Sequence, residues 1–261
     1  MTISTKDIIS LLSEWPERPA GSEDEMMARE AIMVRLMGEY GIDVKEEGIY
    51  APPNLRAFVC VLGVALLIAF GLFALSNVVS IILLGLIIYT VYAVFTGRGS
   101  PLVTMLNARI TANLIAVNNA QAPQKIALIV PFDSYQDQFS CYLPPQFGEG
   151  REHYKTTLIA ASVAAATRLW KTYGSDAEIR LCLLSGSVAG QVGAHQFIKQ
   201  HKTELLDEQI HVFGLHDRDL MPFMRHGIQA SLIDTNEEMT PTSLSNHIEN
   251  KIAEYIAKHK G

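Results

Sequence analysis

One acidic residue ends the strand-like segment IALIVPFDS over residues 126–134. An apolar strand that ends in an acid commonly delivers a carboxylate to a site at the edge of a sheet. Asp133 is therefore a candidate for metal binding or acid–base chemistry. The alternative that the sequence leaves open is a turn or cap residue that bonds to nearby backbone. Pro131, two positions earlier, has no side-chain donor atom for such a site.

Histidines are the next candidates for metal binding or proton transfer. Their spacing contains no HExxH pattern, which would place two imidazoles on one helix face. His211 and His216 flank a predicted strand, so one of them could reach Asp133 or Asp217 at a strand end. The open alternative is a solvated or hydrogen-bonded imidazole near a loop. The eight histidines are His153, His195, His201, His211, His216, His226, His247 and His259.

Gly186, Gly190 and Gly193 follow a predicted strand and precede a predicted helix, as glycines do in nucleotide-binding turns. The segment lacks GxGxxG spacing, a GK[ST] ending and an acidic residue at a second strand end. The next acids, Glu204 and Asp207, follow the helix instead. We therefore expect these glycines to permit a tight strand-to-helix turn rather than to bind a dinucleotide.

The composition points toward a membrane and away from nucleic acid. Of the 261 residues, 49% are hydrophobic and only 18% are charged, and the formal net charge is −6. An acidic chain of this kind lacks the basic surface that nucleic acids require. Cys60, Cys141 and Cys182 form neither a CxxC pair nor a disulfide framework.

The apolar residues concentrate between Ala57 and Gly97, where the sequence has no Asp, Glu, Lys, Arg, His or Pro. Two helices fit there, 57–75 and 78–95, each about 28 Å long at about 1.5 Å per residue. We predict a transmembrane helical hairpin over residues 55–97, with a buried hairpin in a soluble core as the alternative. Small or polar residues that would let a partner helix approach are Ala65, Ala69, Ser80, Gly85, Thr90 and Ala93.

The segments that flank the hairpin predict its orientation. The N-terminal segment carries acidic residues and a proline before any apolar run, unlike a signal peptide. Arg56 and Arg98 lie on either side of the hairpin, and this matches the excess of basic residues in cytoplasmic segments. We therefore expect both termini and the soluble domain in the cytoplasm, at a bacterial inner membrane.

Outside the hairpin, predicted helices and strands alternate, which favours an α/β domain with a mostly parallel sheet between helices. Residues 1–54 and 98–261 together form this domain, which the hairpin interrupts. In the first helix, Ser22 and Glu25 form a predicted capping box. The apolar face of that helix comprises Ile32, Met33, Leu36 and Met37. The predicted strands are 42–50, 112–118, 125–132, 178–186, 209–215 and 228–234, and the later helices are 156–173, 194–201 and 245–258.

Four segments, in order, carry a resemblance to a known family. They are RPAGSEDEMMAREAIMVRLMGEYGIDV, NLIAV with KIALIVPFDS, RLCLLSGSVAGQVGAHQFIKQH and PFMRHGIQASLI. Together they resemble the zinc aminopeptidases of the bacterial leucyl aminopeptidase and glutamate carboxypeptidase type. Some bacterial relatives also carry a hydrophobic hairpin at this place, followed by a segment similar to FTGRGSPL. The resemblance implies a phosphorylase/hydrolase-like aminopeptidase fold with a mixed sheet.

The resemblance fails at the positions of the zinc ligands and of the catalytic glutamate. The family's first ligand, a histidine, corresponds to Pro131, and the aspartate after it corresponds to Asp133. The bridging aspartate corresponds to Leu158, and the pair of glutamates corresponds to Ser187 and Val188. A later aspartate corresponds to His216 or its neighbour, and the final histidine has no counterpart. Proline, leucine and valine side chains cannot bind zinc, and serine is a poor ligand.

The sequence therefore predicts a catalytically inactive, membrane-anchored, peptidase-like protein with no catalytic residue, cofactor or metal. It would act as a binding or accessory subunit of a membrane protein complex. Its partners would be another integral membrane protein, contacted through the hairpin and the cytoplasmic domain, and the lipid bilayer. The alternative is a residual or altered metal-dependent aminopeptidase or hydrolase at the membrane surface.

Overall fold

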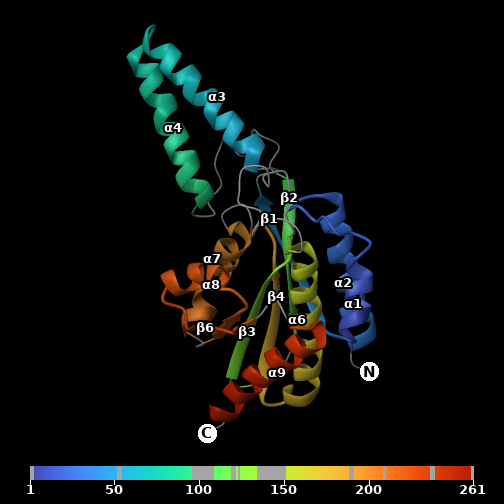
Figure 1. Cartoon of the computed structure of the whole chain (residues 1–261). Helices are drawn as coiled ribbons and strands as arrows, with labels where there is room; N and C mark the ends of the chain where they lie inside the picture. Colours follow the sequence, from blue (N-terminus) through green and yellow to red (C-terminus); the bar gives the residue numbers. More distant parts are fainter. Residues whose placement is uncertain are drawn as a thin grey trace.

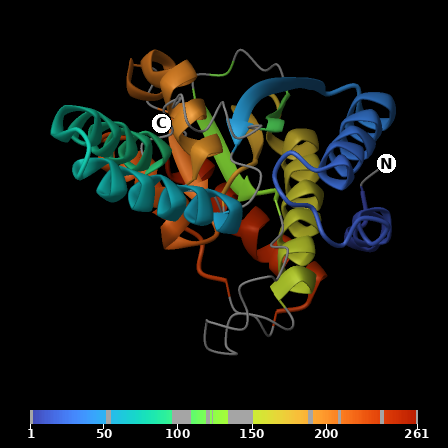
Figure 2. The same ribbon diagram turned by 90° about the horizontal axis from the view of Figure 1, so that it is seen from above.

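The computed structural model describes residues 3–51, 55–95, 109–118, 122, 124–133, 151–187, 191–207, 210–235 and 239–259. They form a sheet between two helical layers, with a helical hairpin that projects from this body (Figures 1 and 2). The helices are α1 (Thr5–Leu12), α2 (Glu23–Tyr40), α3 (Leu55–Phe73), α4 (Asn77–Phe95), α6 (Arg151–Tyr173), α7 (Val192–Asp207), α8 (Asp217–Arg225) and α9 (Pro241–Lys258). The strands are β1 (Asp43–Ala51), β2 (Arg109–Val117), β3 (Gln124–Pro131), β4 (Ala177–Leu184), β5 (His211–Gly214) and β6 (Ala230–Leu232).

The strands form one mixed sheet in the order β1-β2-β4-β3-β5-β6. The four strands β4, β3, β5 and β6 run parallel, whereas β2 is antiparallel to both β1 and β4. The predicted α/β class with a mixed sheet is therefore confirmed. β1 and β2 pair along their whole length, from Asp43 opposite Val117 to Ala51 opposite Arg109. The strands before and after the hairpin thus lie side by side.

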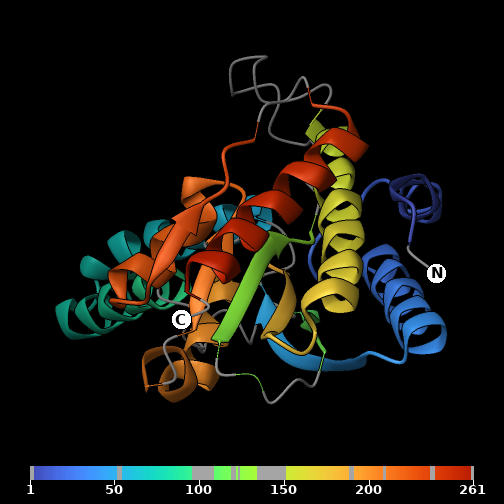
Figure 3. The ribbon, with the colours of Figure 1, turned by 90° about the horizontal axis from the view of Figure 1, so that it is seen from below.

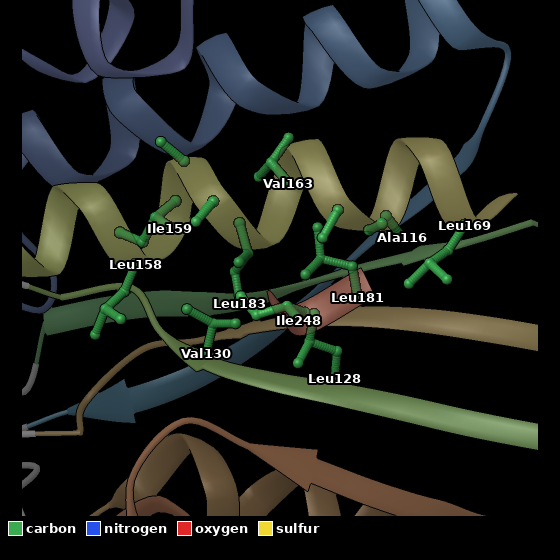
Figure 4. Packing of buried hydrophobic residues seen from close by; sticks show 14 of the residues in the cluster. Ala116, Leu128, Val130, Leu158, Ile159, Val163, Leu169, Leu181, Leu183 and Ile248 are labelled. Carbon is green, nitrogen blue, oxygen red and sulfur yellow. The ribbon is translucent and has the colours of Figure 1, made fainter. Parts of the chain in front are cut away.

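Two hydrophobic cores lie on opposite faces of the sheet, because successive side chains of a strand point in opposite directions. On β3, Leu128 and Val130 belong to the core with α1, α2, α6 and α9, whereas Ala127 and Ile129 belong to the core with α7 and α8. Figure 3 shows α6 and α9 side by side on one face. In Figure 4 the side chain of Leu158 on α6 lies among the buried residues of the first core.

Helix α2 buries a different stripe from the predicted one. Ile32 and Leu36 are buried as expected, but Met37 is 49% exposed and Met33 is only partly buried. Glu25 and Arg29 complete the buried stripe instead. These positions follow the spacing i, i+4, i+7, i+11, which lies along one side of a helix, and Met33 and Met37 fall beside it.

Short elements account for the other differences from the predicted elements. α1 and α8 were absent from the sequence-based assignment, and helices of one or two turns leave only a weak periodic signal. β6 has only three residues, whereas the sequence predicted a strand over 228–234. α9 begins at Pro241 rather than at residue 245, because the Thr240 side chain accepts a hydrogen bond from Ser243 N at 3.2 Å and caps the helix.

The predicted pair of apolar helices is present as α3 and α4, which pack against each other and project from the sheet (Figure 1). Many of their large apolar side chains face outward, among them Leu67 at 72%, Ile82 at 67% and Ile88 at 69% exposure. Over the described residues alone, no helix combines the length and the apolar character needed to cross a bilayer.

Three of the six small and polar residues of the hairpin are used inside it, and the side chain of Ala93 lies outside the described residues. Ala69, Ser80 and Thr90 are fully buried, whereas Gly85 is exposed. Ser80 Oγ donates to Ser76 O at 3.2 Å, and Thr90 Oγ1 donates to Leu86 O at 2.7 Å, so both hydroxyls are satisfied within α4. The predicted partner-facing set is therefore wrong for these three positions.

Candidate functional site

The site expected from the sequence lies where β3 and β4 end. The chain leaves β3 through α6 on one face of the sheet and leaves β4 through α7 on the other. Such a switch point opens a crevice at the carboxyl ends of the strands. Asp133 follows β3 and Ser187 follows β4, and the structure brings them together: Asp133 Oδ1 accepts from Ser187 N at 2.9 Å and from Ser187 Oγ at 2.5 Å.

Asp133 is thus held by a residue 54 positions away, and not only by the local turn contacts that the sequence left open. Asp133 as a whole is only 1% exposed, and its backbone oxygen accepts a hydrogen bond from Lys155 Nζ at 3.0 Å. A backbone N–H and a hydroxyl thus both donate to one oxygen of this side chain. The interaction links the ends of β3 and β4.

Pro131 is the last residue of β3 and is buried opposite Leu184 of β4. A proline cannot donate to a ladder, so it must occupy a position where no ladder N–H is needed, and the pairing of β3 with β5 ends earlier, at Ile129. The sheet hydrogen bonding resumes one residue later, where Phe132 N donates to Leu184 O at 2.8 Å. Pro131 contributes an apolar wall to the crevice and no donor atom.

The remaining sequence candidates have different surroundings. Leu158 is 1% exposed and packs in the first hydrophobic core, and Val188 lies outside the described residues. His216 precedes α8 and makes no side-chain cap hydrogen bond there, while Asp217 is exposed.

His211 is placed at the opposite edge of the sheet from the crevice, which corrects one expectation. His211 is the first residue of β5, which runs parallel to β3. It therefore lies at the amino-terminal ends of these strands, whereas Asp133 follows the carboxyl-terminal end of β3. Its Nε2 lies 2.8 Å from Ser231 Oγ, and its ring stacks on Tyr255 at a centroid distance of 4.3 Å. Burial lowers the pKa of His211, which therefore favours the neutral imidazole.

A buried polar cluster that the sequence analysis missed lies beside Asp133. Glu25 is fully buried and accepts hydrogen bonds from Gly21 N at 2.6 Å and from the Ser185 hydroxyl. Thr111 Oγ1 lies 2.6 Å from Glu25 Oε2 and 2.8 Å from Ser185 Oγ. Burial raises the pKa of Glu25, and the nearby Asp133 raises it further, while the Ser185 and Thr111 hydroxyls counteract the rise.

The sequence signal for this cluster was the motif Ser22-x-x-Glu25, which looked like a local capping box. Half of that interpretation is confirmed, because Ser22 Oγ accepts from Glu25 N at 3.1 Å. The Glu25 carboxylate, however, points into the protein toward β2 and the end of β4. A helix-capping residue thus also connects three segments that are far apart in the chain.

Asn113 fixes the turn between β4 and α7. Its Oδ1 accepts from Ser185 N at 3.1 Å, and its Nδ2 donates to Gly193 O at 3.0 Å. A Cβ on Gly193 would lie 2.1 Å from Ser185 O, so only glycine fits there. This confirms the tight packing expected of that glycine. Gln191, just before α7, has a φ of 61°, which is uncommon for a residue with a side chain.

The hollow at this edge is small where described residues bound it, and it has room for about one water molecule. Its polar lining includes Ser185, Ser187, Gln191 and Asp219, and Pro131 is among its apolar walls. Two zinc ions need several His, Asp or Glu side chains around one space. Within the described parts of the chain, no three His, Cys, Asp or Glu side chains gather in this way. The described residues of this crevice therefore supply too few such side chains for a two-zinc centre.

Comparisons with known proteins agree on the fold. No protein-family model matches the sequence, and no curated protein is similar to it in sequence. Among solved structures, the glutaminyl cyclase of an Acidobacteriales bacterium is similar, with a TM-score of 0.55, 10% identity, and coverage of 99% of this chain and 95% of that chain. The zinc aminopeptidase of Bacillus subtilis has a TM-score of 0.54 and 12% identity, over 97% and 93%. The aminopeptidase of Aneurinibacillus sp. strain AM-1 has a TM-score of 0.53 and 13% identity, over 94% and 92%. The chain therefore has the fold shared by zinc-dependent aminopeptidases and glutaminyl cyclases.

Proposed function

We propose that this protein is a catalytically inactive, membrane-anchored member of that fold, which acts as a binding or accessory subunit of a membrane protein complex. The observation that carries the proposal is the chemistry at the ends of β3 and β4. Pro131 and Leu158 have no side-chain atom that could bind a metal. Ser187 is a neutral residue that donates hydrogen bonds to Asp133 and supplies no second carboxylate. A hydrolase of this fold would need ligands and a base at such positions.

The hairpin supports the membrane part of the proposal. α3 and α4 have 19 residues each, which corresponds to about 28 Å at about 1.5 Å per residue and approaches the thickness of a hydrocarbon core. Apart from Arg56 near the start of α3, the two helices contain no charged residue. Outward-facing Leu, Ile and Phe side chains of this kind are costly in water and favourable in lipid.

The direction of the hairpin supports a partner in the membrane. β1 ends, and β2 begins, at the edge of the sheet where Thr111 contacts Ser185 just after β4. The hairpin therefore emerges on the side of the sheet where β4 ends (Figure 1), and the hollow lined by Ser185 and Ser187 lies on that side. With the hairpin in a bilayer, the crevice would face the membrane surface, within reach of the cytoplasmic segments of another membrane protein.

Zinc content tests the inactive state. The full chain, purified in mild detergent, would be measured for zinc by elemental analysis and assayed for aminopeptidase turnover with and without added zinc. We expect zinc well below one ion per chain and no chelator-sensitive turnover. Stoichiometric zinc with chelator-sensitive turnover would establish the alternative, a residual or altered metal-dependent hydrolase at the membrane surface.

Complex size tests the accessory role. After gentle extraction, native mass analysis should find a complex larger than the 28.8 kDa chain with its micelle. The domain would add a contact of about 800 Å² per partner. Replacing residues 55–97 by an unrelated two-helix anchor should loosen the complex while the domain stays folded. A monomer under every mild condition, unchanged by the swap, would leave the hairpin as a tether only.

Reporter fusions test the localisation. We propose that both termini lie in the cytoplasm at a bacterial inner membrane, because the basic residues Arg56 and Arg98 flank the hairpin on one side. Fusions at residue 1 and at residue 261 should both report the cytoplasm. A periplasmic signal from either fusion would refute this topology.

A further inference from the structure

The face of the sheet that α2 covers continues beyond the helix toward the hairpin. Along β2, Ala116, Leu114 and Ala112 are 1%, 1% and 6% exposed, and the next residue on that face, Ile110, is 72% exposed. Its partner across the strands is Tyr50 of β1, which is 61% exposed. Two large side chains thus form an uncovered pair, which on β2 ends a buried row and on β1 follows the exposed residues Glu46 and Gly48.

This pair lies beside the base of the hairpin. Tyr50 is the second-last residue of β1, and α3 begins at Leu55. Ile110 is the second residue of β2, the first strand after the hairpin. The exposed pair therefore lies on the two strands that lead into and out of the hairpin.

The acidic residues that precede Tyr50 in β1 are compensated by cations. Glu46 accepts from Arg29 Nε at 2.8 Å, and Glu47 Oε1 lies 2.5 Å from His201 Nε2. The hydrogen bond that His201 donates to Glu47 raises the pKa of His201 and favours the charged imidazolium. Repulsion between these carboxylates and anionic lipid headgroups is thereby reduced.

We propose that the Tyr50–Ile110 pair seats the domain on the lipid bilayer, in the zone between headgroups and acyl chains. Tyrosine favours this zone because its ring is apolar and its hydroxyl reaches water. Together with the hairpin, the pair gives the domain a fixed tilt, with the ends of β3 and β4 turned toward the lipid surface. This inference rests on the proposed membrane insertion of the hairpin and adds a second contact to it.

Tryptophan reporters in the full chain test the contact. The variants are Tyr50→Trp at the pair, Ile88→Trp on the hairpin and Val34→Trp on α2, whose native side chain is 60% exposed and lies further from the hairpin. Each is reconstituted in vesicles whose lipids carry bromine either near the glycerol end or near the methyl end of the acyl chains. Trp15 and Trp170 are present in every variant, so the quenching measured for the parent chain is subtracted from that of each variant. Far-UV circular dichroism confirms that each variant folds.

We expect Tyr50→Trp to lose emission to the shallow bromines more than to the deep ones, Ile88→Trp to lose it to the deep ones, and Val34→Trp to lose none. Quenching at Ile88→Trp without quenching at Tyr50→Trp would overturn the seating contact and leave the anchor intact, with a protein partner as the cover of the pair. Absence of quenching at both positions would overturn the anchor and, with it, this inference.

Discussion

Replacing Glu25 by glutamine should destabilise the domain, because the carboxyl group contacts donors from three parts of the chain. Gly21 N–H, the Thr111 hydroxyl and the Ser185 hydroxyl all lie at its two oxygens, in a site with no exposed surface. A protonated carboxyl group still accepts at both oxygens, whereas glutamine replaces one oxygen with an NH₂ group that only donates. One of the three donors then loses its acceptor.

An unsatisfied buried polar group costs about 1–3 kcal/mol. In a chain of more than 150 residues, the melting temperature falls by about 2–4 °C for each kcal/mol. We therefore expect Glu25→Gln to lower the melting temperature by about 2–12 °C. The assay is thermal unfolding of the detergent-solubilised full chain, followed by near-UV circular dichroism. Glu30→Gln, an exposed glutamate on the same helix, is the matched control and should change little.

The pH dependence provides a second readout of the same site. Burial raises the folded-state pKa of Glu25 above its ordinary 4.5. Its contribution to stability is then complete below pH 4.5 and is lost as the pH rises through the folded-state pKa. The glutamine variant lacks this titration, so the difference in melting temperature between parent and variant should be largest near pH 4.5 and narrow at higher pH. Equal melting temperatures for Glu25→Gln, Glu30→Gln and the parent across this range would refute the reasoning.

Two further predictions concern the edges of this network. His201→Gln should destabilise the protein more at pH 6 than at pH 8.5, because the hydrogen bond that His201 donates to Glu47 raises the pKa of His201. The contribution of His201 to stability is present below about pH 6.5 and is lost as the pH rises through the folded-state pKa. Equal effects in urea titrations at both pH values would contradict this. Gly193→Ala should cost about 1–3 kcal/mol because its Cβ would lie 2.1 Å from Ser185 O, whereas Gly38→Ala, where a Cβ meets nothing within 4 Å, should stabilise α2 by about 0.5–1 kcal/mol. Melting temperatures of the two alanine variants that shift in the same direction would show that the close approach at Gly193 is not rigid.

Much of the fold could be predicted because its signals are local. Apolar runs such as KIALIVPF have the length and composition of buried strands, and their alternation with helices favours a sheet covered on both faces. The uncharged segment 57–97 predicts two apolar helices, and α3 and α4 are found there. That Pro131 and Leu158 cannot bind a metal ion follows from the chemistry of their side chains alone.

The tertiary structure decided which side chains meet. The sequence places His211 near a strand, but only the strand order and direction put it at the edge opposite Asp133. The partnership of Asp133 with Ser187 depends on the parallel pairing of β3 and β4, which no local pattern encodes.

The motif Ser22-x-x-Glu25 shows most clearly what the sequence alone cannot predict. Local geometry determines the cap, since residues three apart in the first turn of a helix are neighbours. Whether the Glu25 carboxylate turns to solvent or into the protein depends on Thr111 and Ser185, which lie 86 and 160 residues further along the chain. Sequence patterns thus predicted most of the elements, but not α1, α8 or the buried stripe of α2. Contacts between distant strand ends decided the polar site, because a buried carboxyl group needs hydrogen-bond partners and its pKa depends on them.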